Sequence, residues 1–66
     1  MLSSIPPEIG SLASLNELHL QNNHLRKIPA SIGAIKKLRW LNVSHNDLTN
    51  LPSSLGNLYG TLSLFL

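Results

Sequence analysis

The chain has 66 residues, of which 42% are apolar and 12% charged, and its formal net charge is +2. This balance excludes a disordered chain, whose signature is low hydrophobicity with high charge, and the length allows one small domain. No cysteine occurs, which excludes a disulfide framework and a thiolate metal site and favours a reducing compartment. The small positive excess does not support a nucleic-acid partner, because proteins that bind nucleic acid usually gather cations on one face.

Targeting signals are absent from the sequence. Residues 1–7 lack the basic head and the unbroken apolar core of a signal peptide. Polar residues interrupt the apolar ones at short intervals along the chain, so no membrane span is expected. We therefore expect an intracellular, cytoplasmic protein with no membrane partner.

The sequence repeats itself with a period of 23 residues. Residues 1–14 form a partial repeat, residues 15–37 and 38–60 are complete repeats, and residues 61–66 start a further one. The shared pattern is L-x-x-L-x-L-x-x-N-x-L-x-x-(I/L)-P-x-x-(I/L)-G-x-(I/L), with Val43 filling one leucine position in the second complete copy. Only the tail departs from it, because Thr61 stands where leucine is expected. Such regularity indicates a slice of a repeat array rather than chance periodicity.

This pattern resembles the leucine-rich repeat family over essentially the full chain. Its 23-residue spacing is similar to the intracellular Ras-suppressor and plant intracellular types of that family. Plant receptor-kinase repeats usually run one residue longer, with a glycine before Ile-Pro that is absent here at Arg26-Lys27 and Thr49-Asn50. The resemblance implies an α/β fold: a slice of a leucine-rich repeat solenoid, with a curved parallel sheet and short helical or irregular limbs on its convex side.

The head of the chain is expected to be a convex limb, the part of a repeat that runs along the outer curve. Pro6 and Pro7 fix backbone angles there, and Gly10 permits a turn before the chain points inward again. The segment from Leu15 to Leu20 then ends in an alternation typical of a short strand with its leucines inside. A repeat cannot bury its apolar faces alone, so the leucines at both ends of the slice are expected to be exposed.

The same logic extends to the later copies. Short limbs of one or two turns of α or 3₁₀ helix are predicted over residues 30–35 and 53–58. Side by side, successive repeats should form a parallel sheet of three strands, at Glu17 to His19, Trp40 to Asn42 and Ser63 to Phe65.

An asparagine follows each of the first two strands, where the chain must turn sharply. An amide side chain offers both a donor and an acceptor to backbone groups that the turn leaves unpaired. Because Asn23 and Asn46 occupy the same place in two copies, a structural ladder linking neighbouring repeats is favoured over two unrelated turn residues. The resemblance implies that this ladder is buried.

The sequence carries no convergent set of catalytic or metal-ligating residues. Histidine is a common catalytic residue and metal ligand, but His19, His24 and His45 occupy three different places in the repeat and are not expected to gather. Paired histidines at helical spacing, an activated nucleophile and a glycine-rich phosphate loop are all missing. We expect no enzyme activity, cofactor, metal site or small-molecule substrate.

The outward side chains of the strands form the candidate binding site. Solenoid geometry aligns them across one concave surface, and tryptophan and tyrosine are enriched among interface hot spots. The alternative is that Trp40 and Phe65 only cover apolar surface. The predicted partner-binding residues are Glu17, His19, Arg39, Trp40, Asn42 and Phe65.

Three functions remain open on the sequence alone. The first is a protein-interaction module that binds another protein through the concave face. The second is a structural packing segment of a larger repeat array or assembly, whose partners are neighbouring repeats. The third, a ligand-sensing receptor ectodomain, is disfavoured by the repeat length and by the missing cysteines.

Overall fold

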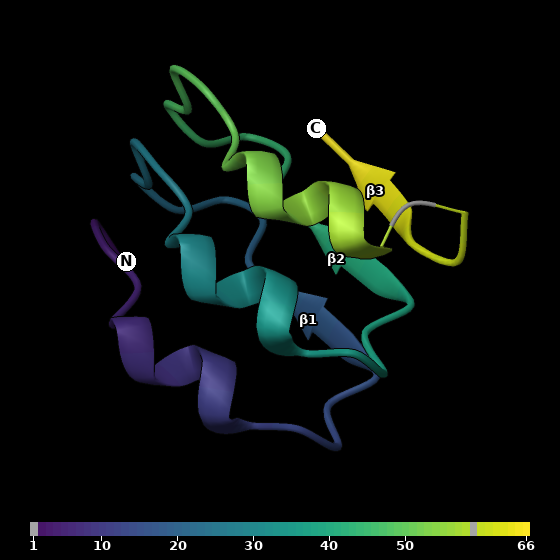
Figure 1. Ribbon diagram of the computed structural model, residues 1–66. Helices are drawn as coiled ribbons and strands as arrows, with labels where there is room; N and C mark the ends of the chain where they lie inside the picture. The colour runs from purple at the N-terminus through teal and green to yellow at the C-terminus, as the bar shows by residue number, and fades with distance from the viewer. Residues whose placement is uncertain (1, 59) are drawn as a thin grey trace.

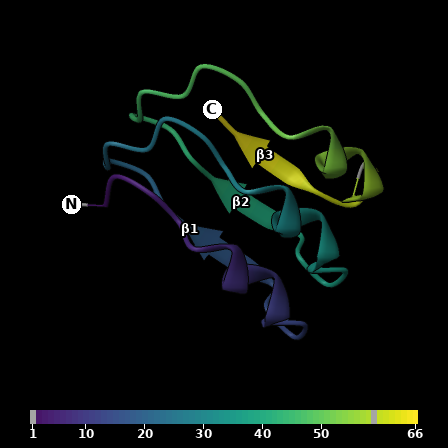
Figure 2. The ribbon, with the colours of Figure 1, turned by 60° about the vertical axis from the view of Figure 1, so that its left-hand side comes forward.

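The computed structural model describes residues 2–58 and 60–66. Strands and 3₁₀ helices (η) alternate in the order η1 (Pro7–Ser11), β1 (Glu17–His19), η2 (Ala30–Ala34), β2 (Trp40–Asn42), η3 (Ser53–Leu58) and β3 (Ser63–Phe65). The three helices stack in one layer and the three strands in another (Figures 1 and 2). This arrangement confirms the predicted solenoid slice.

The strands form a parallel sheet in the order β1-β2-β3. Its register places Glu17 opposite Trp40 and Trp40 opposite Ser63, so each residue pairs with its equivalent one repeat away. The central residue of each strand points inward: Leu41 is fully buried, whereas its equivalents on the two edge strands are half-buried. The three predicted strand segments are therefore confirmed residue by residue.

Proline starts each helical limb. In η1 and η2 the residue before the helix is Pro6 or Pro29, with extended backbone angles, and its carbonyl accepts a hydrogen bond from the amide three residues on, at 3.1 Å in both limbs. Proline is tolerated there because its missing N–H would have had no helical partner. The predicted short helical limbs are thus confirmed, as 3₁₀ helices. None of the helices in residues 2–58 and 60–66 is long and apolar enough to cross a membrane.

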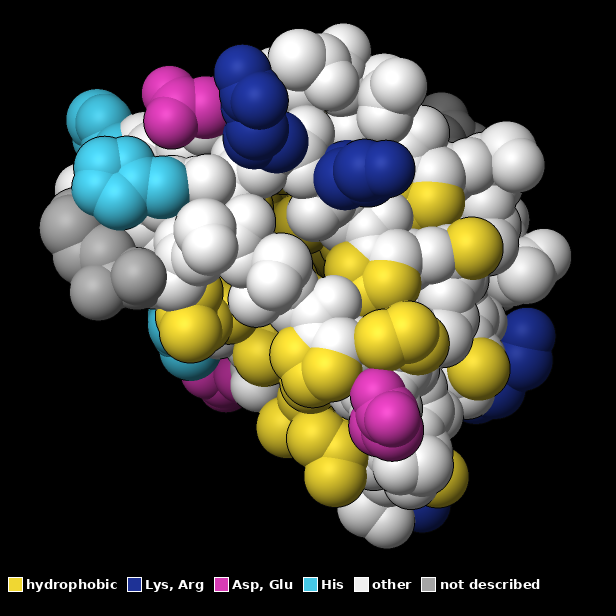
Figure 3. Space-filling model, turned by 90° about the vertical axis from the view of Figure 1, so that its left-hand side faces the viewer, with side chains coloured by type: hydrophobic (Ala, Val, Ile, Leu, Met, Phe, Trp, Pro, Cys, Tyr) yellow, Lys and Arg dark blue, Asp and Glu magenta, His cyan; other side chains and the backbone are white. Residues whose placement is uncertain are grey.

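The hydrophobic core lies between the two layers and is most completely buried where the two complete repeats meet. Its largest fully buried side chains are Leu25, Ile32, Ile35, Leu38, Leu41 and Val43. Toward the ends the equivalent residues are open: Leu2 is 50% exposed, Leu12 49% and Leu66 72%. Figure 3 looks at the side where the N-terminal segment and η1 lie, and shows hydrophobic side chains gathered in a band across it. Each repeat therefore depends on its neighbours for burial.

The helical limbs approach one another so closely that a glycine is required between them. A Cβ atom on Gly10 would lie 2.7 Å from the carbonyl oxygen of Ser31, and one on Gly33 would lie 2.5 Å from that of Ser54. The same serines join the limbs, because the Ser31 hydroxyl donates to the Pro7 carbonyl at 2.6 Å and the Ser54 hydroxyl donates to the Ala30 carbonyl at 2.6 Å. A glycine facing a serine of the next repeat thus fixes the spacing of the convex layer.

This close approach predicts that alanine is destabilising at one glycine and nearly neutral at its equivalent in the next repeat. Gly33→Ala should lower the free energy of unfolding by about 1 to 3 kcal/mol, since the added methyl group overlaps rigid backbone of the next limb. Gly56→Ala should change it by less than about 0.5 kcal/mol, because nothing lies within 4 Å of the position its Cβ would take. Urea unfolding followed by circular dichroism measures both, and equal unfolding midpoints for the two variants would contradict the packing described.

Candidate functional site: the exposed face of the sheet

Three rings form a row across the exposed face of the sheet, here called the aromatic row: His19 on β1, Trp40 on β2 and Phe65 on β3. The Trp40 and Phe65 ring centroids are 4.4 Å apart, and those of His19 and Trp40 are 6.1 Å apart, both pairs tilted. Trp40 is 37% exposed and Phe65 is 40% exposed. The row therefore presents a preassembled aromatic surface made from three repeats.

The row is bent relative to the sheet register. His19 and Phe65 are both in register with Asn42, whereas Trp40 lies two residues earlier on β2, in register with Glu17 and Ser63. The Trp40 ring nevertheless lies next to the rings of His19 and Phe65. Long aromatic side chains can span this diagonal of about 8 Å, since adjacent strands lie about 4.8 Å apart and two residues span about 6.6 Å. Trp40 thus lies between the two other rings.

Glu17 pairs with His19, the member of the row that β1 contributes. They are two residues apart on the same face of the strand, and His19 Nε2 lies 3.0 Å from Glu17 Oε1. Both side chains are largely exposed, at 66% for Glu17 and 48% for His19. The pair holds the His19 ring in place at the β1 end of the row, but an exposed pair of this kind adds little stability.

Asn42 and Arg39 are placed differently from the other predicted site residues. Asn42 is half-buried, and its Oδ1 accepts hydrogen bonds from the Ser44 amide at 3.0 Å and the Ser44 hydroxyl at 2.7 Å. Arg39 precedes β2, and its backbone bonds to Asn16 and Ser63 on the two neighbouring repeats, at 2.8 Å each. The structure therefore brings five predicted residues onto one face and puts Arg39 at its edge.

Two adjoining hollows extend from this edge, and sequence reasoning missed the second. The first, about 310 Å³, is lined by Glu17, Trp40 and Ser63 together with Asn16, Arg39 and Thr61. The second, about 540 Å³, shares Asn16, Arg39 and Thr61 and adds Lys36, Lys37 and Gly60. We call Lys36, Lys37 and Arg39 the basic rim. Their clustering just before β2 is the sequence signal that could have revealed it.

Asn46 makes hydrogen bonds both within its own repeat and to the one before it. Its Oδ1 accepts from the Leu25 amide at 2.9 Å, and its Nδ2 lies 2.9 Å from the carbonyl oxygens of Leu20 and Val43. Asn23 is placed alike: its Oδ1 accepts from the Leu2 amide at 2.8 Å and its Nδ2 donates to the Leu20 carbonyl at 2.9 Å. Both side chains are half-buried rather than fully buried as the resemblance implied, because the turns they close lie at the surface beside exposed residues.

The residue before each of these asparagines has an unusual backbone conformation. Asn22 has a φ of 60° and His45 a φ of 57°, and the two positions are one period apart. Such left-handed angles are uncommon outside glycine, although asparagine and histidine adopt them more readily than most residues. The turn that follows each strand is therefore tight and is closed by the asparagine beside it.

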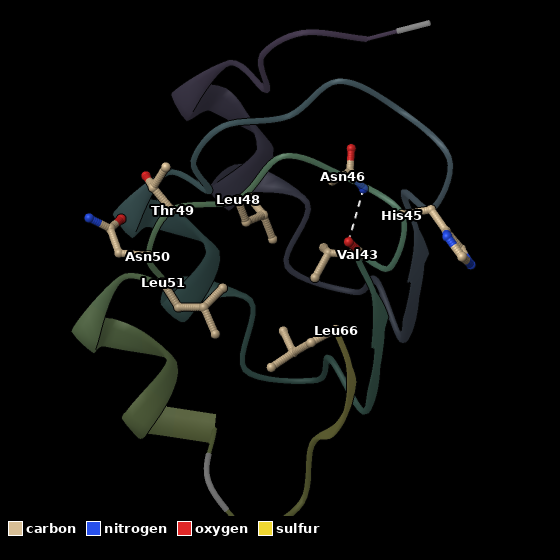
Figure 4. A pocket seen from close by; sticks show the side chains of 8 residues that line it. All are labelled: Val43, His45, Asn46, Leu48, Thr49, Asn50, Leu51 and Leu66. Carbon is tan, nitrogen blue, oxygen red and sulfur yellow. Dashed lines mark hydrogen bonds between the residues drawn. The ribbon is translucent and has the colours of Figure 1, made fainter.

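A third hollow, about 270 Å³, lies beyond this turn in the second complete repeat (Figure 4). The side chains of Leu48, Leu51 and Leu66 converge on it, while His45 points away. Asn46 lies at its border and donates to Val43 (Figure 4). In the preceding repeat the residues equivalent to Leu48 and Leu51 are Leu25 and Ile28, which are buried, so this hollow is open repeat core rather than an enclosed ligand site.

Titratable side chains do not gather elsewhere in the part of the chain that the structure describes. Within residues 2–58 and 60–66, no three histidine or acidic side chains are grouped so as to hold a metal ion. His24 Nδ1 lies 3.8 Å from Asp47 Oδ2, and both side chains are exposed. These two residues occupy the same position in successive repeats.

Comparisons with known proteins agree with the geometry. Residues 2–48 match the family described as leucine rich repeat, which is more than half of the chain, so the protein belongs to the leucine-rich repeat family. A solved leucine-rich repeat protein of Leptospira interrogans is 42% identical, with a TM-score of 0.89. The match covers 97% of this chain and 16% of that one, so the chain spans a small part of that protein's length. No curated protein matches the chain. Leucine-rich repeat domains are generally protein-interaction modules and are typically not enzymes.

The bonds of Asn46 predict a stability difference between two asparagines of the same repeat. Asn46→Leu should lower the free energy of unfolding by about 1 to 3 kcal/mol, because the Leu25 amide and the Val43 carbonyl lose their bonds to this side chain. Asn50→Leu, at an exposed position in the convex limb, should cost less than about 0.5 kcal/mol. Thermal and urea unfolding would compare the two, and a variant at position 46 as stable as that at position 50 would refute a linking role.

Proposed function

We propose that the chain is a protein-interaction module whose binding surface is the exposed face of the sheet, centred on Trp40. The observation that carries this proposal is the aromatic row, in which the rings of His19 and Phe65 each lie next to the Trp40 ring and all three stay partly open. Large aromatic side chains at the centre of a polar surround are typical anchors of protein interfaces.

The surroundings of the row support a protein as the partner. Glu17, Asn42 and Arg39 supply a carboxylate, an amide and a guanidinium around the rings, which suits a polar rim. Preassembly also lowers the cost of binding, because rings that already pack on their neighbours lose little side-chain freedom. The hollows beside the row are open to solvent, whereas a small molecule is usually enclosed by its site.

A packing segment within a larger repeat assembly is the second candidate. It is favoured by one observation, the exposure of leucines at both ends of the core, with Leu66 at 72%. In that case neighbouring repeats, rather than a separate protein, would cover the apolar surface. An intracellular location and the Ras-suppressor or plant intracellular type stay predictions, supported by the cysteine-free sequence and the repeat spacing.

Replacing Trp40 tests the proposal directly. Trp40→Ala should weaken capture of a partner protein by about 1.5 kcal/mol or more, roughly tenfold in affinity, because it removes the central ring of the row. The matched control is Leu12→Ala, which removes another exposed apolar side chain, at the end of η1 and away from the sheet face. The measurement is recovery of bound proteins from an extract of the source organism, quantified by mass spectrometry.

The two variants separate the candidate functions. Binding through the sheet face requires that Trp40→Ala loses proteins that wild type and Leu12→Ala both retain. An unchanged set of proteins with unchanged recovery for Trp40→Ala would reject this site and leave the packing segment as the better account.

A further inference from the structure

The basic rim concentrates positive charge at one edge of the proposed binding surface. Lys36, Lys37 and Arg39 are three of the five lysines and arginines in the chain, and all three line one hollow of about 540 Å³. No acidic side chain is among the residues that line it. The hollow therefore has a positive potential, which its concave shape concentrates.

The rim cations are also free to pair with a partner. In the part of the chain that the structure describes, the only ion pairs within 4.0 Å are His19 with Glu17 and His24 with Asp47. All three rim residues are exposed. A carboxylate arriving from outside would thus form new pairs here without breaking existing ones.

The rim adjoins the aromatic row. The hollow that contains the rim shares Asn16, Arg39 and Thr61 with the hollow beside Trp40, so the two hollows adjoin, and together they are here called the channel. The backbone at its centre is fixed, because the Arg39 amide donates to the Asn16 carbonyl and the Ser63 amide donates to the Arg39 carbonyl, both at 2.8 Å. The backbone from which Arg39 and Trp40 project is therefore held in place between the neighbouring repeats.

The placement of Glu17 gives the channel a direction. Glu17 lines the hollow beside Trp40 but not the one that contains the rim. A carboxylate beside Trp40 would meet like charge there, whereas one further along the channel would meet only cations. The favoured ligand therefore places its apolar group against the rings and its acidic groups beyond them.

We propose that the partner contributes an acidic peptide segment with an apolar side chain next to its carboxylates, an inference that rests on the proposed function. The apolar side chain packs on Trp40 and Phe65, and the carboxylates pair with the basic rim. A nucleic acid fits less well, because three clustered cations span few phosphates and the Glu17 carboxylate stands beside Trp40. Charge pairing at such an edge mainly raises the association rate and makes binding sensitive to salt.

The test is an NMR titration of the isotope-labelled 66-residue chain with the probe peptide Gln-Gln-Leu-Glu-Glu, whose acidic groups lie on one side of the leucine. A matched peptide, Gln-Gln-Leu-Gln-Gln, removes only the charge, and a thymidine oligonucleotide represents nucleic acid. The rim variant combines Lys36→Gln, Lys37→Gln and Arg39→Gln. Its control combines Arg26→Gln and Lys27→Gln, which remove the two remaining cations of the chain, at exposed positions outside the channel.

The expected result is that the acidic peptide shifts the amide signals of Lys36, Lys37, Arg39 and Trp40. The glutamine peptide and the rim variant should each weaken binding about tenfold, equivalent to about 1.4 kcal/mol. The control variant should bind within about twofold of wild type, and added salt should weaken the wild-type complex. Equal binding of the two peptides, no binding of the acidic one, or tighter binding of the oligonucleotide would each overturn the inference.

Failure of this inference can be told apart from failure of the proposed function. If Trp40→Ala loses its captured proteins while the rim variant keeps them, the face binds protein but not through acidic groups. If the rim variant loses the captured proteins and Trp40→Ala keeps them, binding depends on acidic groups of the partner but is not centred on the aromatic row. If neither variant changes recovery, both proposals fail.

Discussion

The fold depends on how each repeat closes its turn, because backbone groups there find partners in the neighbouring repeat. The Leu25 amide donates to the side chain of Asn46, and the Leu25 carbonyl accepts from the Asp47 amide at 2.9 Å. One period earlier, Leu2 is bonded in the same two ways to Asn23 and His24. Backbone groups left unpaired away from water cost about 1 to 3 kcal/mol each, so the asparagines join repeats as well as shaping turns.

These links set the register between the strands of neighbouring repeats. That register in turn decides which side chains form the proposed binding surface. Glycine and serine set the spacing of the convex layer, while the asparagines and the strand bonds set the spacing of the sheet. Equivalent residues are thereby brought side by side across strands about 4.8 Å apart. A tryptophan, a histidine and a phenylalanine that are far apart in sequence then form one row, and its shape is fixed before any partner arrives.

The positions of the strands and limbs could be predicted from the periodicity alone, because they are set by which residues must face inward. The three strands and the 3₁₀ limbs lie where the leucine spacing put them. The lean of the Trp40 ring toward Phe65 could not be foreseen, since side-chain torsions depend on neighbours contributed by other repeats. The same holds for the hollow around Lys36 and Lys37, whose walls come from three repeats. Only the three-dimensional stacking showed that Gly33 meets Ser54.

Amide hydrogen exchange at Leu25 tests most directly whether side chains join the repeats. Its amide bonds to the Asn46 side chain, whereas the amides of Leu20 and Val43 bond to backbone carbonyls of the next repeat. If the link is as firm as the sheet, Leu25 exchanges as slowly as Leu20 and Val43 in the same sample. Exchange of the Leu25 amide at the rate of an unprotected residue, while the other two stay protected, would contradict the account.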